Sequence, residues 1–157
     1  MLGDTVASLP NDDPAATSVI TEIGRAAIRR GVLAMPFGIA AGWVLGRYQS
    51  TSDVEQGATV LALYLGFTLV PALAASIHAG RVASGRLRKT VLGSMAAALA
   101  AGLAWGAFGG VAMYGFGLAT TLRIDAMGVG ALCVLTGLVA GALGALLGVG
   151  LGRRRVG

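Results

Sequence analysis

The chain has 157 residues, of which 55% are hydrophobic and only 12% charged, and its net charge is +5. Soluble domains carry about 25% charged residues, so this composition excludes a soluble enzyme. High hydrophobicity also excludes a disordered chain. The class that remains is an integral membrane protein.

The N-terminal stretch is the longest polar part of the chain. We expect residues 1–13, which are polar and acidic, to form a disordered cytoplasmic tail. Asp13-Pro14 is typical of a helix start, because Asp caps the amide groups of the first turn and Pro suits the first helical position. Apolar residues then recur on one helix face. Residues 14–30 are therefore predicted to form an amphipathic juxtamembrane helix at the membrane interface.

Four apolar runs follow, and a spanning helix needs about 20 apolar residues. The third run is too long for one span and too short for two, so we expect its helix to end near residue 113. Pro36 and Pro71 lie within the first two spans, where static kinks are expected. The predicted fold is all-α, an integral membrane four-helix transmembrane bundle with a short N-terminal amphipathic helix. Its transmembrane domain covers residues 31–152, with spans at about 31–46, 57–78, 90–113 and 127–151.

Basic residues orient the predicted bundle, because Lys and Arg concentrate in cytoplasmic loops. Ten of the twelve lie on one side: before the first span, between the second and third, and after the last. We therefore predict a multi-pass protein of the cell membrane with cytoplasmic N and C termini, ending in a basic tail at 153–157. The predicted cytoplasmic basic anchors are Arg29, Arg30, Arg86, Arg88, Lys89, Arg153, Arg154 and Arg155.

Glycines recur at intervals of mostly four residues in the first, third and fourth spans. In lipid, small residues drive helix association because they let two backbones approach closely. The glycine faces either pack the bundle internally or form an exposed groove for another subunit. We expect internal packing for two series and leave the fourth span open. The predicted helix-packing residues are Gly38, Gly42, Gly46, Gly102, Gly106, Gly110, Gly137, Gly141, Gly144, Gly148 and Gly152.

Aromatic residues are predicted to collect in the outer half of the bundle. The favoured interpretation is an interfacial belt, in which ring bodies lie in lipid and polar tips reach water. The alternative is an outward-facing pocket for an apolar ligand. The predicted outer aromatic cluster is Trp43, Tyr48, Tyr64, Trp105 and Tyr114.

Catalytic chemistry has little support in this sequence. It has no HExxH, GxSxG or P-loop motif, and its single cysteine, Cys133, is predicted to be a small apolar packing residue. Every acidic and basic residue lies outside the predicted spans or at their ends, which argues against proton coupling. His78, at the end of the second span, is interpreted as an interfacial residue. We therefore predict no enzyme, no catalytic residues, no metal site and no cofactor.

Two functional hypotheses remain. The leading one is a non-catalytic scaffold, assembly or accessory subunit that docks other membrane subunits through its glycine-rich helix faces. The alternative is a small oligomeric channel or facilitator for a neutral or lipophilic solute, which needs no buried charge. The predicted partners are the lipid bilayer and other membrane subunits or further copies of the chain. No nucleic acid is expected, because the positive charge belongs to membrane orientation.

Overall fold

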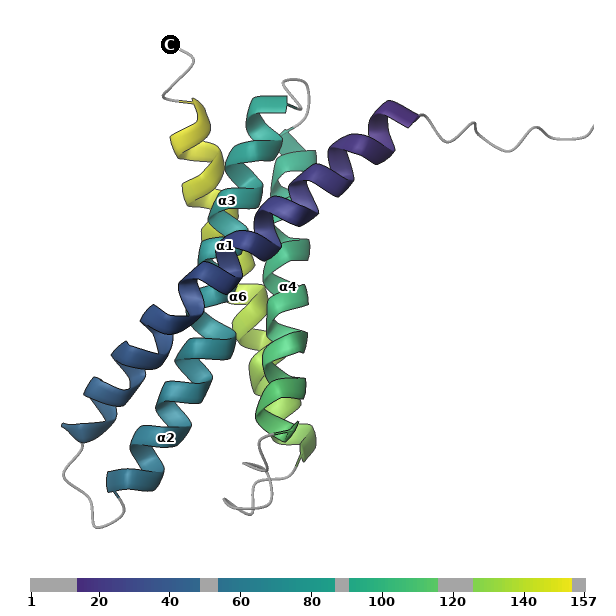
Figure 1. The fold of residues 1–157 in the computed structure, drawn as a ribbon. Coiled ribbons are helices and arrows are strands. Elements are labelled where there is room, and N and C mark those ends of the chain that lie inside the picture. Colours follow the sequence, from purple (N-terminus) through teal and green to yellow (C-terminus); the bar gives the residue numbers. More distant parts are fainter. Residues whose placement is uncertain (1–13, 49–53, 87–90, 116–125, 154–157) are drawn as a thin grey trace, which may run out of the picture.

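The computed structural model describes residues 14–48, 54–86, 91–115 and 126–153 (Figure 1). The predicted tail at 1–13 and most of the basic tail at 153–157 lie outside these residues. The described chain is all-helical and forms a four-helix bundle, which confirms the predicted fold class. Its elements are α1 (Pro14–Arg47), α2 (Val54–Tyr64), the π-helical turn η1 (Leu65–Leu69), α3 (Val70–Arg86), α4 (Val91–Gly115) and α6 (Ala126–Arg153).

Four helical stretches among the described residues are long and apolar enough to cross a membrane. They are Thr17–Arg47, Gly57–Ser84, Leu92–Gly115 and Met127–Gly148. The second joins α2, η1 and α3 into one continuous span. The chain is therefore a multi-pass membrane protein.

The bundle has two distinct ends in Figure 1. At the upper end, called the α3–α4 end below, α3 ends, α4 begins, and the N-terminal half of α1 and the last turns of α6 are found. At the lower end α1 ends beside the start of α2. Helices α3, α4 and α6 pack closely, whereas α1 crosses α3 obliquely and touches α4 little.

The first helix is longer than predicted. The amphipathic segment 14–30 and the first span are one continuous helix, α1, rather than an interfacial helix followed by a separate span. The physical reason is local: Arg29, Arg30 and Gly31 are flanked by good helix formers, and no cap or proline separates the two segments. The charged residues that suggested a boundary are tolerated inside the helix.

The second span contains a widened turn. Pro71 lacks an N–H group, and its ring crowds the carbonyl of Phe67, four residues earlier. The π-helical turn η1 lies directly before Val70 and Pro71 and relieves this crowding without ending the span. Pro71 itself is fully buried.

Glycine contacts hold the helices together. A Cβ atom on Gly106 would lie 2.5 Å from the Cys133 carbonyl oxygen of α6, and one on Gly42 would lie 2.5 Å from the Leu61 carbonyl oxygen of α2. A Cβ atom on Gly148 would lie 2.6 Å from the Ile77 carbonyl oxygen of α3. Backbones this close require residues without side chains. The same holds for Gly38, Gly46, Gly102, Gly137, Gly141 and Gly144.

The predicted packing glycines therefore contact helices of the same chain. This includes the series on α6, whose use was left open: Gly137 and Gly141 face α4, and Gly144 and Gly148 face α3. A Cβ atom on Gly110 would find ordinary contact distances, and the surroundings of Gly152 lie outside the description. The nine glycines in tight contact therefore already pack against helices of their own chain.

Candidate functional site: an apolar cleft beside a basic cluster

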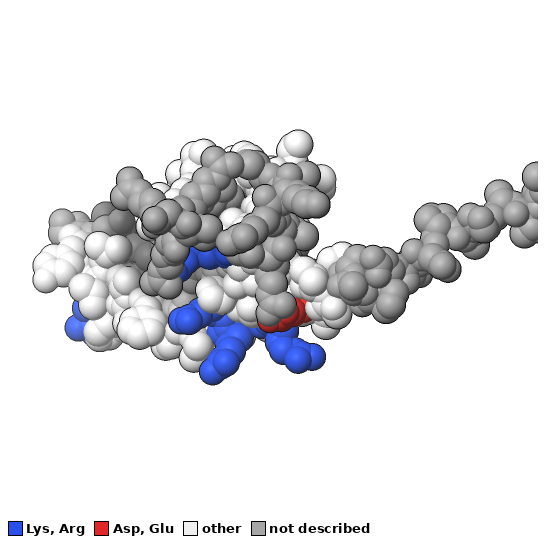
Figure 2. Space-filling model, turned by 90° about the horizontal axis from the view of Figure 1, so that it is seen from above, with Lys and Arg blue, Asp and Glu red and all other residues white. Residues whose placement is uncertain are grey.

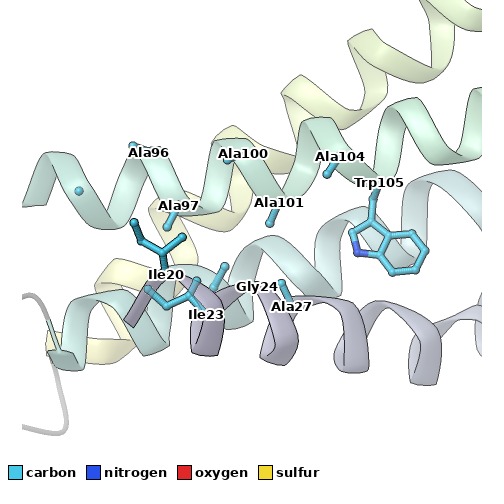
Figure 3. A pocket seen from close by; sticks show the side chains of 12 residues that line it. Ile20, Ile23, Gly24, Ala27, Ala96, Ala97, Ala100, Ala101, Ala104 and Trp105 are labelled. Atoms are coloured by element: carbon cyan, nitrogen blue, oxygen red, sulfur yellow. The ribbon is translucent and has the colours of Figure 1, made fainter. Parts of the chain in front are cut away.

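An apolar cleft of about 470 Å³ separates the N-terminal half of α1 from α4 (Figure 3). Helix α1 crosses α3 obliquely and makes few contacts with α4, which leaves the cleft between α1 and α4. Its floor is Ala79 of α3, and Trp105 closes one end. The walls are Ile20, Ile23, Gly24 and Ala27 of α1 and Gly93, Ala96, Ala97, Ala100, Ala101 and Ala104 of α4.

The cleft is open on one side. Ile20, at its rim, is 70% exposed, and Ala96, Ala100 and Ala104 on α4 are exposed as well. A Cβ atom on Gly24 would meet nothing within 4 Å. The small residues that line the cleft therefore leave an unfilled volume next to lipid, in contrast to the glycines that close the α4–α6 contact.

The position of Trp105 shows where along the bundle the cleft ends. Its ring touches Gly31, where a Cβ atom would clash with it, and it packs edge-to-face on Phe108 with ring centroids 5.3 Å apart. Gly31 and Trp105 lie near the middle of α1 and α4 respectively. The cleft thus runs from the middle of the bundle towards the α3–α4 end.

Arginines of α1 lie at the same depth. Because Gly31 touches Trp105, the preceding Arg29 and Arg30 belong to the central part of α1 rather than to its end. Both are exposed. Gly31, where the first span was predicted to start, therefore lies near the middle of one continuous helix.

A second helix adds positive charge beside them. Arg30 and Arg81 both lie within electrostatic range of the His78 ring, which is half-buried on α3. Seen from the α3–α4 end, blue basic side chains lie along one edge of the bundle, with red acidic atoms beside them (Figure 2). We call Arg30, His78 and Arg81 the basic cluster.

The other predicted basic anchors contribute less to the described site. Arg86 and Arg153 end α3 and α6, but their side chains are outside the description. Arg88, Lys89, Arg154 and Arg155 lie wholly outside the described residues. Only Arg29 and Arg30 of the predicted set can be placed relative to the cleft.

The predicted aromatic cluster is not brought together. Trp43 and Tyr48 lie exposed near the end of α1, where the Arg47 guanidinium carbon is 4.0 Å from the Trp43 ring centroid. Tyr114 is exposed at the end of α4. Trp105 is only 8% exposed and lines the cleft instead, because its place near the middle of α4 puts it against α1.

Polar groups inside the bundle form local hydrogen bonds. The hydroxyls of Tyr64 and Thr136 lie 2.5 Å apart, and Ser76 donates to the Ala72 carbonyl at 2.6 Å. Thr68, fully buried, donates to the Cys133 sulfur at 3.7 Å. Among the described side chains, no buried nitrogen or oxygen atom lacks a partner. The Tyr64–Thr136 and Thr68–Cys133 pairs link different helices, whereas the Ser76 hydrogen bond lies within α3. None of these residues lines the cleft.

Comparison with protein-family models, with curated proteins and with solved structures gives no match for this chain. Sequence reasoning missed the cleft, although one signal was present. Ala96, Ala97, Ala100, Ala101 and Ala104 recur on one face of α4 at helical spacing, as the glycines do.

Proposed function

We propose that this chain is a non-enzymatic multi-pass protein of the cell membrane that binds a lipophilic molecule in the cleft between α1 and α4. The observation that carries this proposal is the cleft itself, lined by alanine, glycine, isoleucine and tryptophan and open on its side. Its volume of about 470 Å³ falls within the range of roughly 300–1,000 Å³ typical of small-molecule sites.

The location of the cleft favours a ligand that comes from the bilayer. It lies along two membrane-spanning helices, α1 and α4, and its exposed rim residue Ile20 is apolar. An apolar ligand loses nothing by leaving lipid for such a site and gains close contacts with the cleft walls. The proposed activity is that of a carrier or facilitator for a lipophilic compound, which requires no buried catalytic group.

We further propose that the α3–α4 end faces the cytoplasm. Ten of the twelve basic residues of the sequence come before the first predicted span, between the second and third, or after the last, and such a bias sets the orientation of short-loop membrane proteins. Both termini are then cytoplasmic, and the cleft opens towards the inner leaflet.

The accessory-subunit hypothesis was based on glycine grooves available to another protein. Nine of these glycines make tight contacts within the chain, so that hypothesis now has less to support it than the lipophile-binding one. The accessory-subunit hypothesis stays a prediction, and purification in mild detergent tests it. A second membrane protein that co-purifies with this chain in fixed proportion would favour it.

The lipophile-binding proposal is tested by filling the cleft. Ala100→Leu adds three carbons to an exposed position on the cleft wall. Ala107→Leu makes the same change on an exposed position of α4 that does not line the cleft. Organic extraction of the purified proteins, followed by mass spectrometry, measures the lipophilic molecules that each retains.

We expect the Ala100→Leu protein to lose most of the bound compound, while the Ala107→Leu protein retains it at the wild-type level. Equal retention by both variants, with unchanged melting temperatures, would overturn the proposal.

A further inference from the structure

The closed end of the cleft carries one polar side-chain group. Among the described residues that line the cleft, only Trp105 has a polar atom in its side chain, because the others are alanine, glycine and isoleucine. That atom is the indole nitrogen, Nε1. In Figure 3 it lies on the side of the indole that faces the cleft, while the six-membered ring points away from the cleft. A hydrogen-bond donor therefore faces an otherwise apolar cavity.

The indole N–H group of Trp105 has no partner within the described part of the chain. The side-chain hydrogen bonds found there join serine, threonine, tyrosine, cysteine and methionine side chains, and none of them includes Trp105. Every fully enclosed nitrogen or oxygen atom of the described side chains has a partner, so the unpaired Nε1 is reachable from the cleft. The side chain as a whole is only 8% exposed. A donor in such a place is expected to have an acceptor.

Water is poorly suited to be this acceptor. A buried water molecule is typically held by about three hydrogen bonds, with a range of about two to four. The cleft offers it only the N–H group of Trp105, because the other lining side chains are apolar and the backbone groups of a helix are paired within it. An oxygen atom attached to an apolar molecule is better suited, because the cleft walls hold the molecule and the oxygen needs one donor.

The depth of Trp105 restricts the chemistry of that oxygen. Helix α4 extends from Val91 to Gly115, so about 21 Å of helix precede Trp105 and about 15 Å follow it. The hydrocarbon core of a bilayer is about 30 Å thick, which puts Trp105 near its middle. A carboxylate or phosphate there would be costly, and the ester oxygens of phospholipids lie in the interfacial region. The acceptor that suits this depth is neutral and belongs to a molecule without a large polar headgroup.

We propose that the cleft binds a neutral lipid of the quinone class, whose ring carbonyl oxygen accepts a hydrogen bond from Trp105 Nε1. This inference rests on the proposed function and names its ligand class. A quinone carries uncharged carbonyl oxygens on a flat ring. The α4 wall suits a flat ring, because Ala97, Ala101 and Ala104 beside Trp105 project no long side chain. The apolar tail of the ligand then runs between α1 and α4 towards Ile20 at the rim.

The test compares two probes of similar shape, one of which lacks an acceptor. Decyltrimethylbenzoquinone has two ring carbonyls, whereas decyltrimethylbenzene has the same tail and methyl groups without oxygen. Each full-length protein is incubated in detergent micelles with equal amounts of both probes and purified again. Extraction followed by mass spectrometry gives the ratio of the two probes retained.

Trp105→Phe removes the donor and keeps an aromatic ring at the end of the cleft. Trp43→Phe makes the same change at an exposed position near the end of α1 and serves as the matched control. We expect the wild-type protein and Trp43→Phe to retain the quinone in preference to the hydrocarbon, relative to the ratio in protein-free micelles. Trp105→Phe should lower this preference about fivefold, the factor that corresponds to a hydrogen bond of about 1 kcal/mol.

A second measurement leaves Trp105 in place and decides the matter if Trp105→Phe does not fold. The chain has two tryptophans, so the indole N–H resonance of Trp43→Phe protein with isotope-labelled tryptophan belongs to Trp105 alone. A hydrogen bond to a carbonyl moves such a proton resonance downfield. The quinone should therefore shift the resonance downfield, and the hydrocarbon should not.

Two results would overturn the inference: a preference for the quinone that is unchanged in Trp105→Phe, or a bound quinone without a downfield shift of the Trp105 resonance. Failure of the proposed function is distinguishable, because neither probe would then be retained and Ala100→Leu would have no effect. Retention of both probes in their micellar ratio, with both lost in Ala100→Leu, would refute only the hydrogen bond to the ligand.

Discussion

The contact between α4 and α6 allows a sharp prediction at Gly106. A Cβ atom there would lie 2.5 Å from the Cys133 carbonyl oxygen and 3.0 Å from the Gly137 Cα atom. Ordinary contacts lie at roughly 3.5–4.0 Å, so Gly106→Ala forces the two helices about 1 Å apart. Overpacking of this kind costs about 1–3 kcal/mol. The higher helix propensity of alanine returns about 1 kcal/mol, which leaves a net destabilisation of up to about 2 kcal/mol.

The matched control is Gly130→Ala on α6, where a Cβ atom would meet nothing within 4 Å. This change gains helix propensity without a clash, so it should be neutral or stabilising by up to about 1 kcal/mol. Unfolding in mixed micelles with rising denaturing detergent, followed by circular dichroism, measures both free energies. If Gly106→Ala is as stable as Gly130→Ala, the close α4–α6 contact is refuted.

Three further predictions concern packing and orientation. Gly148→Leu should lower the melting temperature of the monomer itself, because α3 backbone fills the space beside Gly148. Leu135→Ala, at a 59% exposed position, should lower it only slightly. Dissociation of an oligomer without loss of the fold in Gly148→Leu would contradict this prediction. Tyr64→Phe should destabilise by about 0.6 kcal/mol in the same unfolding assay, the average for a hydrogen bond between transmembrane helices, and no effect would refute that bond. In a cysteine-free background, an impermeant thiol reagent on intact cells should label Ser50→Cys but not Ser84→Cys, and the reverse pattern would invert the topology.

The number of spans was predictable because hydropathy over 20 residues is a strong signal. The glycine spacing likewise predicted close helix contacts. It could not identify the helices in contact, since Gly42 meets α2 and Gly106 meets α6 through crossing angles that a single helix does not determine. The use of the α6 glycines therefore needed the structure.

The candidate site was less predictable than the fold. Arg30 looked like the end of a polar segment, because a charged residue beside an apolar run usually marks a membrane boundary. The contact between Gly31 and Trp105 moves it to the centre of a helix. The cleft depends on the oblique path of α1, which follows from tertiary packing. The apolar face of residues 14–30 predicted an amphipathic helix, but its spacing does not give the angle at which α1 crosses α3.

The most direct test of lipid binding in the cleft uses Trp105, which lies at its closed end. The chain has two tryptophans, so Trp43→Phe leaves the fluorescence of Trp105 alone. A quinone quenches the fluorescence of a tryptophan that it contacts, so decyltrimethylbenzoquinone is the probe. We predict strong quenching of Trp105, reduced by Ala100→Leu and unaffected by Ala107→Leu. Quenching that is the same in both variants would show that the quinone does not enter the cleft.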